Sequence, residues 1–451
     1  MIKLLLLETR LLVRERIALV LLALALVGCA LAFINGRSLI NQQIEGRAIS
    51  AAEDKKTVDD FSKKLGENEP AEERVLSPYQ IRFGILAPIP TLVDFSAGRA
   101  AFENYSTQVS LRARADTLFK RTQLDNPEML MRGSFDLGFV AIVLAPLLLI
   151  GLGYGLFVAD RDSGAARLVL AQGANPVRLL AARSIPRLML VLTPVLLTAL
   201  ALLTFGPDIS GRSSAAAAWL AITALLLLFW WAVILFINSL RISAETAALA
   251  LISFWVLLTL VLPALITATA QTIYPPPSRF DQIATARAAE VASTQAYEND
   301  HPDLAAEDAA GRLASIRKTW EIGKVVDAAI APTTLAFETQ LARQQRLVGN
   351  LSWLSPPLIA GNALNDSART GEQSWLGFRT ASRTYLGQFR AALGSLVESG
   401  APLDAQRFTN IPRFNWQWPA SNIVGALAFL IILTGGIGIV AVQRFRNLRL
   451  D

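Results

Sequence analysis

Long uncharged apolar runs, separated by charged stretches, dominate the hydrophobic pattern of the chain. A helix that crosses a bilayer needs about 20 mostly apolar residues, at about 1.5 Å of rise per residue. Six segments meet this requirement without a charged residue in their interior: 17–34, 137–158, 188–205, 215–237, 247–269 and 420–442. The pattern therefore predicts a mainly α polytopic membrane protein with six transmembrane helices.

The connections between the predicted spans differ greatly in length. Residues 35–136 separate the first two spans, residues 270–419 separate the last two, and the other connections are short. In the second insertion, amphipathic segments at 333–351 and 375–397 indicate a mostly helical structure. We expect breaks at its prolines: Pro275–Pro277, Pro302, Pro332 and Pro356-Pro357. The two insertions are predicted to form two extracytoplasmic domains.

The composition supports the membrane assignment. Hydrophobic residues make up 53% of the 451 residues and charged residues only 17%, whereas a soluble chain carries about a quarter charged residues. The formal net charge is +6. On a soluble protein such a surplus would suggest nucleic acid as a partner, so its position along the chain decides what it means.

The lysines and arginines of the short segments set the orientation, because long loops translocate largely regardless of their charge. Thirteen of these residues lie in segments 1–16, 159–187, 238–246 and 443–451, whereas the short loop 207–214 carries Arg212 alone. Both termini are therefore predicted to be cytoplasmic, with residues 443–451 as a tail. The basic surplus records orientation, and nucleic acid is not expected as a partner.

The start of the chain allows two alternatives. The sequence Leu26-Val27-Gly28-Cys29 matches a lipoprotein cleavage signal, but the leading segment is long and contains Glu8 and Glu15, which favours a retained helix. Residues 1–16 place leucines beside arginines. They form either an amphipathic helix on the inner membrane surface or an ordinary positively charged anchor.

The chain lacks the residues that several kinds of chemistry need. The chain has one cysteine and one histidine, and its only Gly-Lys pair, Gly323-Lys324, precedes Val325, so the phosphate-binding loop G-x-x-x-x-G-K-[ST] is absent. No catalytic, cofactor-binding or metal-binding residues are predicted, and the substrate-binding residues are unknown. The spans also lack the ionisable residues that a proton- or ion-coupled transporter usually needs. We therefore expect neither an enzyme nor a secondary transporter, and no cofactor in this chain.

The segment 159–187 carries the densest charge pattern. It begins with Asp160-Arg161-Asp162 and Ser163-Gly164, continues with an apolar stretch at 165–171 and a break at 173–176, and ends in a basic amphipathic stretch at 177–187. A helix–turn–helix of this kind on the cytoplasmic side suits a docking element for a soluble partner. The alternative is a positively charged loop that only connects two spans.

Several sequence segments resemble the permease subunits of ABC-2-type transporters, in the subgroup with two large periplasmic insertions. The resemblance rests on these segments: Leu124-Asp125-Asn126-Pro127, Gly133-Ser134-Phe135-Asp136-Leu137, Pro146-Leu147-Leu148, Asp160–Ala165 with Arg167, Leu168 and Leu170, Leu354-Ser355-Pro356-Pro357, and Asn362–Asn365. The family signature after the second span is acidic–basic–acidic–x–Gly–Thr. Here Asp162 replaces the usual glutamate and Ala165 replaces the threonine.

The resemblance implies an exporter in a bacterial inner membrane. Two permease halves would pair, either two copies of this chain or this chain and a sibling. Cytoplasmic ABC ATPase subunits, which hold ATP and Mg²⁺, would dock on the segment after the second span. Ser163 and Gly164 belong to this segment. Its polar contacts would come from Asp160, Arg161, Asp162 and Arg167, and Leu168 and Leu170 would fill an apolar groove.

A second function shares this architecture. ATP hydrolysis inside the cell would drive a periplasmic partner mechanically, for instance a substrate-binding or siderophore-handling protein, and no substrate would pass through the spans. In either case membrane lipid surrounds the spans. A membrane-anchored enzyme is a third class, for which neither insertion offers a recognisable catalytic constellation.

Overall fold

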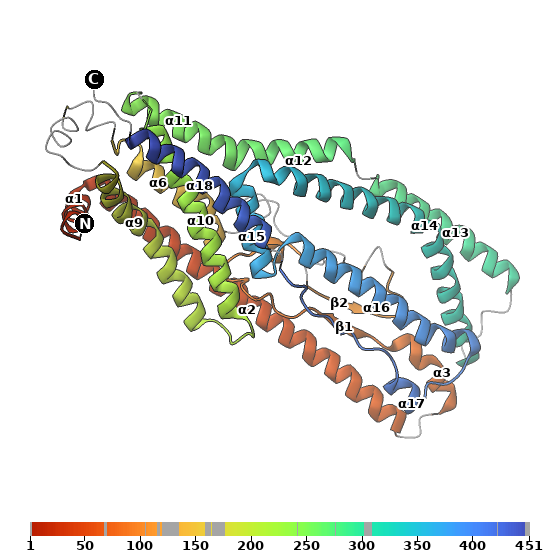
Figure 1. Ribbon diagram of the computed structural model, residues 1–451. Coiled ribbons are helices and arrows are strands. Elements are labelled where there is room, and N and C mark those ends of the chain that lie inside the picture. The colour runs from red at the N-terminus through yellow and green to blue at the C-terminus, as the bar shows by residue number, and fades with distance from the viewer. Residues whose placement is uncertain are drawn as a thin grey trace.

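The computed structural model describes residues 2–66, 70–103, 105–114, 118–119, 135–157, 164, 176–240, 242–275, 277–301, 309–421 and 423–446. Helices dominate these residues (Figure 1). The predicted docking residues Asp160–Ser163, Arg167, Leu168 and Leu170 lie outside the described residues, as does the predicted break at Pro302.

Within the described residues, five helices are long and apolar enough to cross a membrane: Arg16–Leu65, Val177–Phe205, Arg212–Asn238, Ala244–Ile273 and Val424–Arg446. The predicted second span corresponds to a shorter apolar helix, Leu137–Gly153. The chain is therefore a mainly α, multi-pass membrane protein. These helices belong to elements α2 (Arg16–Gly66), α5–α6 (Leu137–Gly153), α9 (Pro176–Phe205), α10 (Arg212–Asn238), α11–α12 (Ala244–Ile273) and α18 (Val424–Arg446).

Several helices continue past the ends of the apolar runs that predicted the spans. α2, which contains the predicted span 17–34, runs to Gly66, since no proline interrupts residues 35–66. The basic stretch 177–187 and the predicted span 188–205 form one helix, α9. α18 begins at Val424 rather than at residue 420, and its last turn includes Arg444 and Arg446 of the predicted tail.

Two spans contain a π-helical stretch just before a proline. Val140–Leu144 precedes Ala145-Pro146 in the second span, and Leu257–Val261 precedes Leu262-Pro263 in the fifth. Proline has no N–H and its ring collides with the carbonyl four residues earlier. The wider π turn accommodates both defects without ending the helix.

The first insertion continues α2 and adds α3 (Ala71–Gln80), β1 (Phe83–Leu86) and β2 (Ser106–Val109). β1 and β2 pair antiparallel, with Phe83 opposite Val109. The second insertion contains α13 (Arg279–Asp300), α14 (Ala309–Leu351), α15 (Pro356–Ala368), α16 (Glu372–Ser399) and α17 (Ala405–Thr409). The predicted break at Pro332 is wrong, since this proline lies inside α14, whereas Pro356-Pro357 begins α15.

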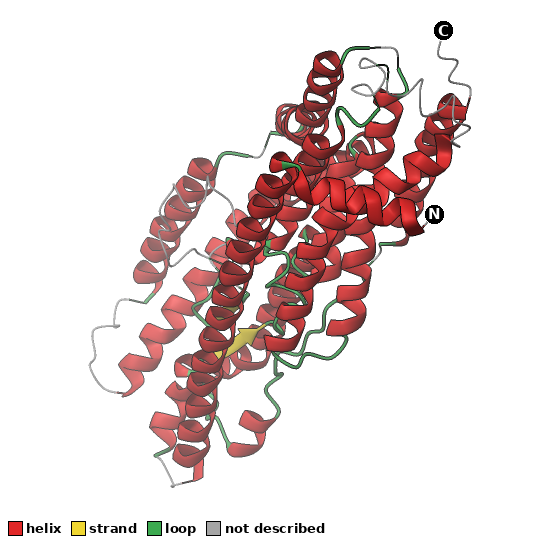
Figure 2. Ribbon diagram, turned by 90° about the vertical axis from the view of Figure 1, so that its left-hand side faces the viewer, coloured by secondary structure: helices red, strands yellow, loops and turns green. Residues whose placement is uncertain are grey.

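The two insertions share one hydrophobic core. Phe83 and Val109 of the first insertion pack with Phe378 and Phe389 of the second, and the rings of Phe83 and Phe389 meet edge to face at 5.6 Å. The short sheet is enclosed among long helices (Figure 2). The prediction of two separate outer domains is therefore corrected to one shared body, because apolar residues of both insertions are buried in a single cluster.

Candidate functional site

The end of α6 (Ala145–Gly153) carries the first element of the site. The last carbonyls of a helix have no partner within the helix, so side chains or water must satisfy them. Here Arg187 Nε donates to the carbonyl of Leu152 at 3.1 Å, and Arg183 Nη1 donates to that of Leu156 at 3.0 Å. Both arginines lie near the start of α9, four residues apart and therefore on one helix face. They join the two ends of the segment 158–175.

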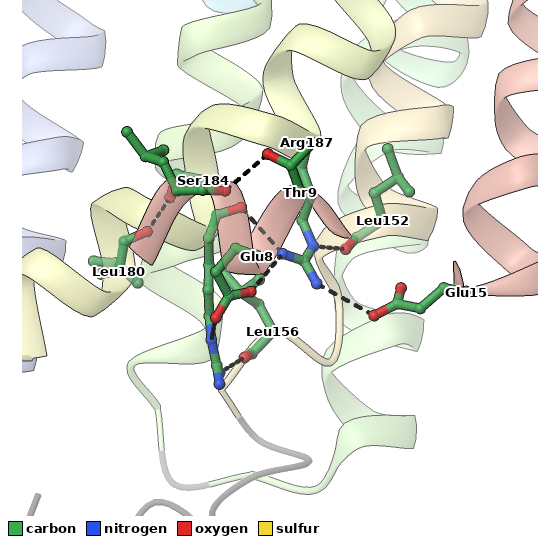
Figure 3. Close-up of polar contacts among 10 residues, drawn as sticks. Glu8, Thr9, Glu15, Leu152, Leu156, Leu180, Ser184 and Arg187 are labelled. Carbon is green, nitrogen blue, oxygen red and sulfur yellow. Dashed lines mark hydrogen bonds and ion pairs between the residues drawn. The ribbon is translucent and has the colours of Figure 1, made fainter. Parts of the chain in front are cut away.

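A carboxylate from the first helix completes this cluster (Figure 3). Glu8 lies on α1 (Ile2–Arg14), with Oε1 3.2 Å from Arg183 Nε and Oε2 4.0 Å from Arg187 Nη1. The side chains of Glu8, Arg183 and Arg187 are only 10–17% exposed. Glu15, which is half exposed, lies 3.7 Å from Arg187. A largely buried carboxylate between two guanidinium groups offsets the cost of burying their charge.

The amphipathic character of α1 explains its position. Glu8 and Leu12, four residues apart, are buried against the helix bundle. Leu6, Leu7 and Leu11 are about half exposed. Leucines that face outward beside arginines suit the boundary between lipid headgroups and acyl chains. α1 can therefore lie along a membrane surface while its buried face holds the arginines of α9.

Asn238, the last residue of α10, fixes the same end of α6. Its Nδ2 donates to the carbonyls of Gly153 and Ile234, both at 2.9 Å, and its Oδ1 accepts from the backbone N–H of Phe157 at 3.2 Å. The ring of Phe157 meets that of Phe445 in α18 at 5.0 Å. We call Glu8, Leu152, Leu156, Arg183, Arg187 and Asn238 the coupling frame.

The coupling frame lies at both ends of the predicted docking segment 159–187. Phe157, which precedes the segment, contacts α10 and α18. The last part of the segment, 177–187, lies in α9, where Arg183 and Arg187 contact α1 and the end of α6. Of the predicted docking residues the structure describes only Gly164, whose φ of 75° lies in the left-handed region. A force applied to this segment would act on four spans and α1 together.

A second polar cluster, which we call the joint, lies where the spans meet the insertions. Arg212, at the start of α10, donates to the carbonyls of Thr91 at 3.0 Å and Leu202 at 2.9 Å, and to Asp94 Oδ2 at 2.5 Å. Trp219 Nε1 donates to Ser96 Oγ at 3.0 Å. Burial raises the pKa of Asp94, and the hydrogen bond from Arg212 opposes this rise. The joint consists of Asp94, Ser96, Arg212 and Trp219.

Hydrogen bonds to backbone groups connect the region around the joint to the second insertion and to the second span. Arg99 N donates to Thr370 O at 2.9 Å, and Thr370 Oγ1 donates to Ser96 O at 2.8 Å. Asp136 caps the second span by accepting from Phe139 N, and its other oxygen accepts from Ala97 N, both at 2.7 Å. Residues 91–99 therefore contact the start of the second span, α10 and the residue Thr370 of the second insertion.

In the described part of the chain, no three side chains among histidine, cysteine, aspartate and glutamate are grouped as metal ligands. His301 follows α13, and its ring stacks on Tyr297 at 4.3 Å. Cys29, the residue that follows the predicted cleavage signal, is buried within α2.

The comparisons with known proteins concern the second insertion. Residues 280–417 match a family described as a domain of unknown function, DUF3526. This match begins in α13 and ends in the segment after α17. No curated protein and no solved structure matches the chain.

The sequence pattern predicted a docking segment at 159–187, which stays a prediction, and it missed the contacts at the ends of that segment. Arg183 and Arg187 counted as charges that set the orientation and as part of the basic stretch 177–187, although their spacing of four also places both on one helix face. Glu8 counted only against a cleaved signal, although a glutamate among leucines and arginines can pair with a basic side chain. Asn238 and Asp94 gave no signal, because their partners lie 81 and 118 residues away.

Proposed function

We propose that this chain is the permease subunit of an ABC-2-type exporter, powered by separate cytoplasmic ATPase subunits that dock on the segment 159–187. The coupling frame is the observation that supports this most directly. A docking segment can transmit force only if its ends are fixed to the spans, and the hydrogen bonds of Arg183, Arg187 and Asn238 supply that attachment.

The outward leucines of α1 and the charges of the docking segment agree with a cytoplasmic location for the coupling frame. In this proposal two permease halves pair in the membrane, and closure of the ATPases moves residues 159–175 together with α6 and α9. The ATPases hold ATP and Mg²⁺ in this proposal. This chain does not, since the phosphate-binding loop is absent from its sequence. The two insertions lie on the opposite side of the membrane.

Co-purification from native membranes tests the docking segment. The full chain is expected to retain an ATPase, and Ala substitutions at Asp160, Arg161 and Asp162 are expected to release it. A matched control replaces an exposed acidic–basic–acidic set on α13, Asp281, Arg287 and Glu290, and should retain the ATPase. If the Asp160–Asp162 variant kept both the complex and its ATP-dependent activity, the assigned docking site would be wrong.

The joint favours a second function, in which ATP hydrolysis drives a periplasmic partner mechanically. A buried ion pair between Asp94 and Arg212 joins the spans to a body that both insertions build. Under this function, hydrogen exchange in residues 309–421 of the complex changes on addition of ATP, and no solute crosses the bilayer. Transfer of a solute across proteoliposomes would favour the exporter instead.

A further inference from the structure

A cavity of about 560 Å³ lies in the shared body of the insertions, and none of its lining residues belongs to the coupling frame or the joint. One wall is the part of α2 that carries Gln42, Gln43 and Arg47, and another is the end of the sheet, with Tyr105 and Ser106. The third wall is the apolar stretch Leu86–Ile89. A volume of this size falls in the usual range for small-molecule sites.

Hydrogen bonds between neighbouring elements hold the walls of the cavity in place. Asp54 on α2 accepts from the backbone N–H of Gly84 in β1 at 2.8 Å, which holds the helix against the sheet. Ala87 N donates to Tyr105 O at 3.0 Å, which holds the apolar wall against the start of β2. The cavity therefore exists before a ligand enters, and binding costs little reorganisation.

The polar groups at this cavity lack a counter-charge. Arg47 has no acidic partner among the described residues, and its Nη1 and the hydroxyl of Tyr105 are buried without a hydrogen-bond partner there. No carboxylate lines the cavity. The two acidic groups that act on Tyr105, Glu103 and Glu372, are both paired with Arg99. A guanidinium without a counter-ion is costly to bury, so the arrangement favours an anion.

We propose that this cavity binds a small organic monocarboxylate. Arg47 would pair with the carboxylate, because a guanidinium matches its two oxygens with parallel N–H donors. The amides of Gln42 and Gln43 and the hydroxyls of Tyr105 and Ser106 add neutral donors, and the stretch Leu86–Ile89 accepts the apolar part of the ligand. With a single positive charge among its lining residues, the cavity suits one negative charge better than the two of a phosphate monoester.

The test measures binding by the full chain in lipid nanodiscs, with a panel of straight-chain and aromatic monocarboxylates from acetate to octanoate and benzoate. Alcohols of the same length and inorganic phosphate serve as matched probes. At least one carboxylate is expected to bind with a dissociation constant below about 1 mM, and more tightly than its alcohol. The proposal fails if no carboxylate binds, if the alcohol binds equally well, or if phosphate displaces the carboxylate.

Variants then place the ligand in the cavity. Arg47→Gln is expected to weaken carboxylate binding at least tenfold, whereas Arg82→Gln, at an exposed arginine before β1, should leave it unchanged. A Cβ at Gly46 would meet open space, so Gly46→Leu should block the cavity while Gly46→Ala preserves binding. Unchanged binding in both Arg47→Gln and Gly46→Leu would overturn the proposal, and neither result depends on the ATPase.

Discussion

The guanidinium of Arg212 lies 2.5 Å from Oδ2 of Asp94, and the two side chains are 5% and 0% exposed. Arg212 is the first residue of α10, and Asp94 lies in the first insertion, 118 residues earlier. The pair therefore places the start of α10 and the first insertion on the same side of the bundle. It also makes residues 91–99 one of the places where the spans and the insertions meet.

Removal of one charge at the joint should destabilise the protein strongly. Arg212→Gln leaves Asp94 buried without its counter-charge, and we expect a loss of roughly 3–5 kcal/mol in the free energy of unfolding. Equilibrium unfolding in mixed micelles measures it. The control is Arg312→Gln, which breaks an exposed pair with Glu73 and should cost at most about 1 kcal/mol. Equal losses in the two variants would contradict a structural role for the joint.

Two glycines on α2 give a matched pair of substitutions. A Cβ at Gly36 would lie 2.2 Å from the backbone oxygen of Asp94, whereas a Cβ at Gly46 meets nothing within 4 Å. Gly36→Ala should therefore push α2 away from the joint and cost roughly 1–3 kcal/mol. Gly46→Ala should stabilise the helix by up to about 1 kcal/mol. The same unfolding assay distinguishes them, and a stabilising Gly36→Ala would show that this contact is looser than described.

Substitutions at Glu8 and Glu15 test whether the coupling frame contributes to stability and to docking of the ATPase. Glu8→Gln removes a carboxylate that is only 10% exposed from between two arginines, and we expect a loss of roughly 3 kcal/mol together with less co-purified ATPase. Glu15 is 53% exposed, so Glu15→Gln should change stability by less than about 1 kcal/mol. If both variants retained the ATPase fully, the attachment of α1 to α9 would have no part in docking.

Asp366 on α15 predicts a pH dependence of stability. Burial raises the pKa of Asp366 to about 6 from an ordinary value of 3.8, against the opposing charge of Arg369. Between these values the folded state binds more protons than the unfolded state, so the stabilising effect of the neutral carboxyl is lost as the pH rises through about 6. Asp366→Asn keeps a neutral side chain at every pH.

The difference in Tm between Asp366→Asn and the unsubstituted chain should therefore grow from pH 4 to pH 6 and then level off. Thermal unfolding of both proteins across this range measures it. A difference that does not change with pH would show that Asp366 is not the group responsible.

The apolar runs predicted the helical membrane class because twenty consecutive apolar residues have few alternatives to a spanning helix. The ends of the helices were predicted less well. Polar helix formers after residue 34 continue α2 into the first insertion, and hydropathy cannot distinguish a helix that leaves the membrane from one that ends there. Likewise, the basic stretch 177–187 and the span that follows it form one helix, α9.

The shared core of the insertions could not be predicted from the sequence. Phe83 and Phe389 are 306 positions apart, and each lies in an amphipathic element that is compatible with a core of its own. The residues of the joint and of the cavity at Arg47 also come from distant parts of the sequence, so the sequence pattern did not predict either. The charged segment at 160–162 was recognisable because its residues are adjacent, whereas the frame that holds it is assembled from α1, α6, α9 and α10.

Photo-cross-linking from position 167 tests the proposed function most directly. A photoreactive amino acid replaces Arg167 in the full chain in native membranes, and the cross-linked proteins are identified by mass spectrometry. We predict capture of an ABC ATPase from position 167, and no such capture when the same group replaces Ser210, an exposed residue in the connection between α9 and α10. Capture of the ATPase from position 210 and not from position 167 would contradict the account.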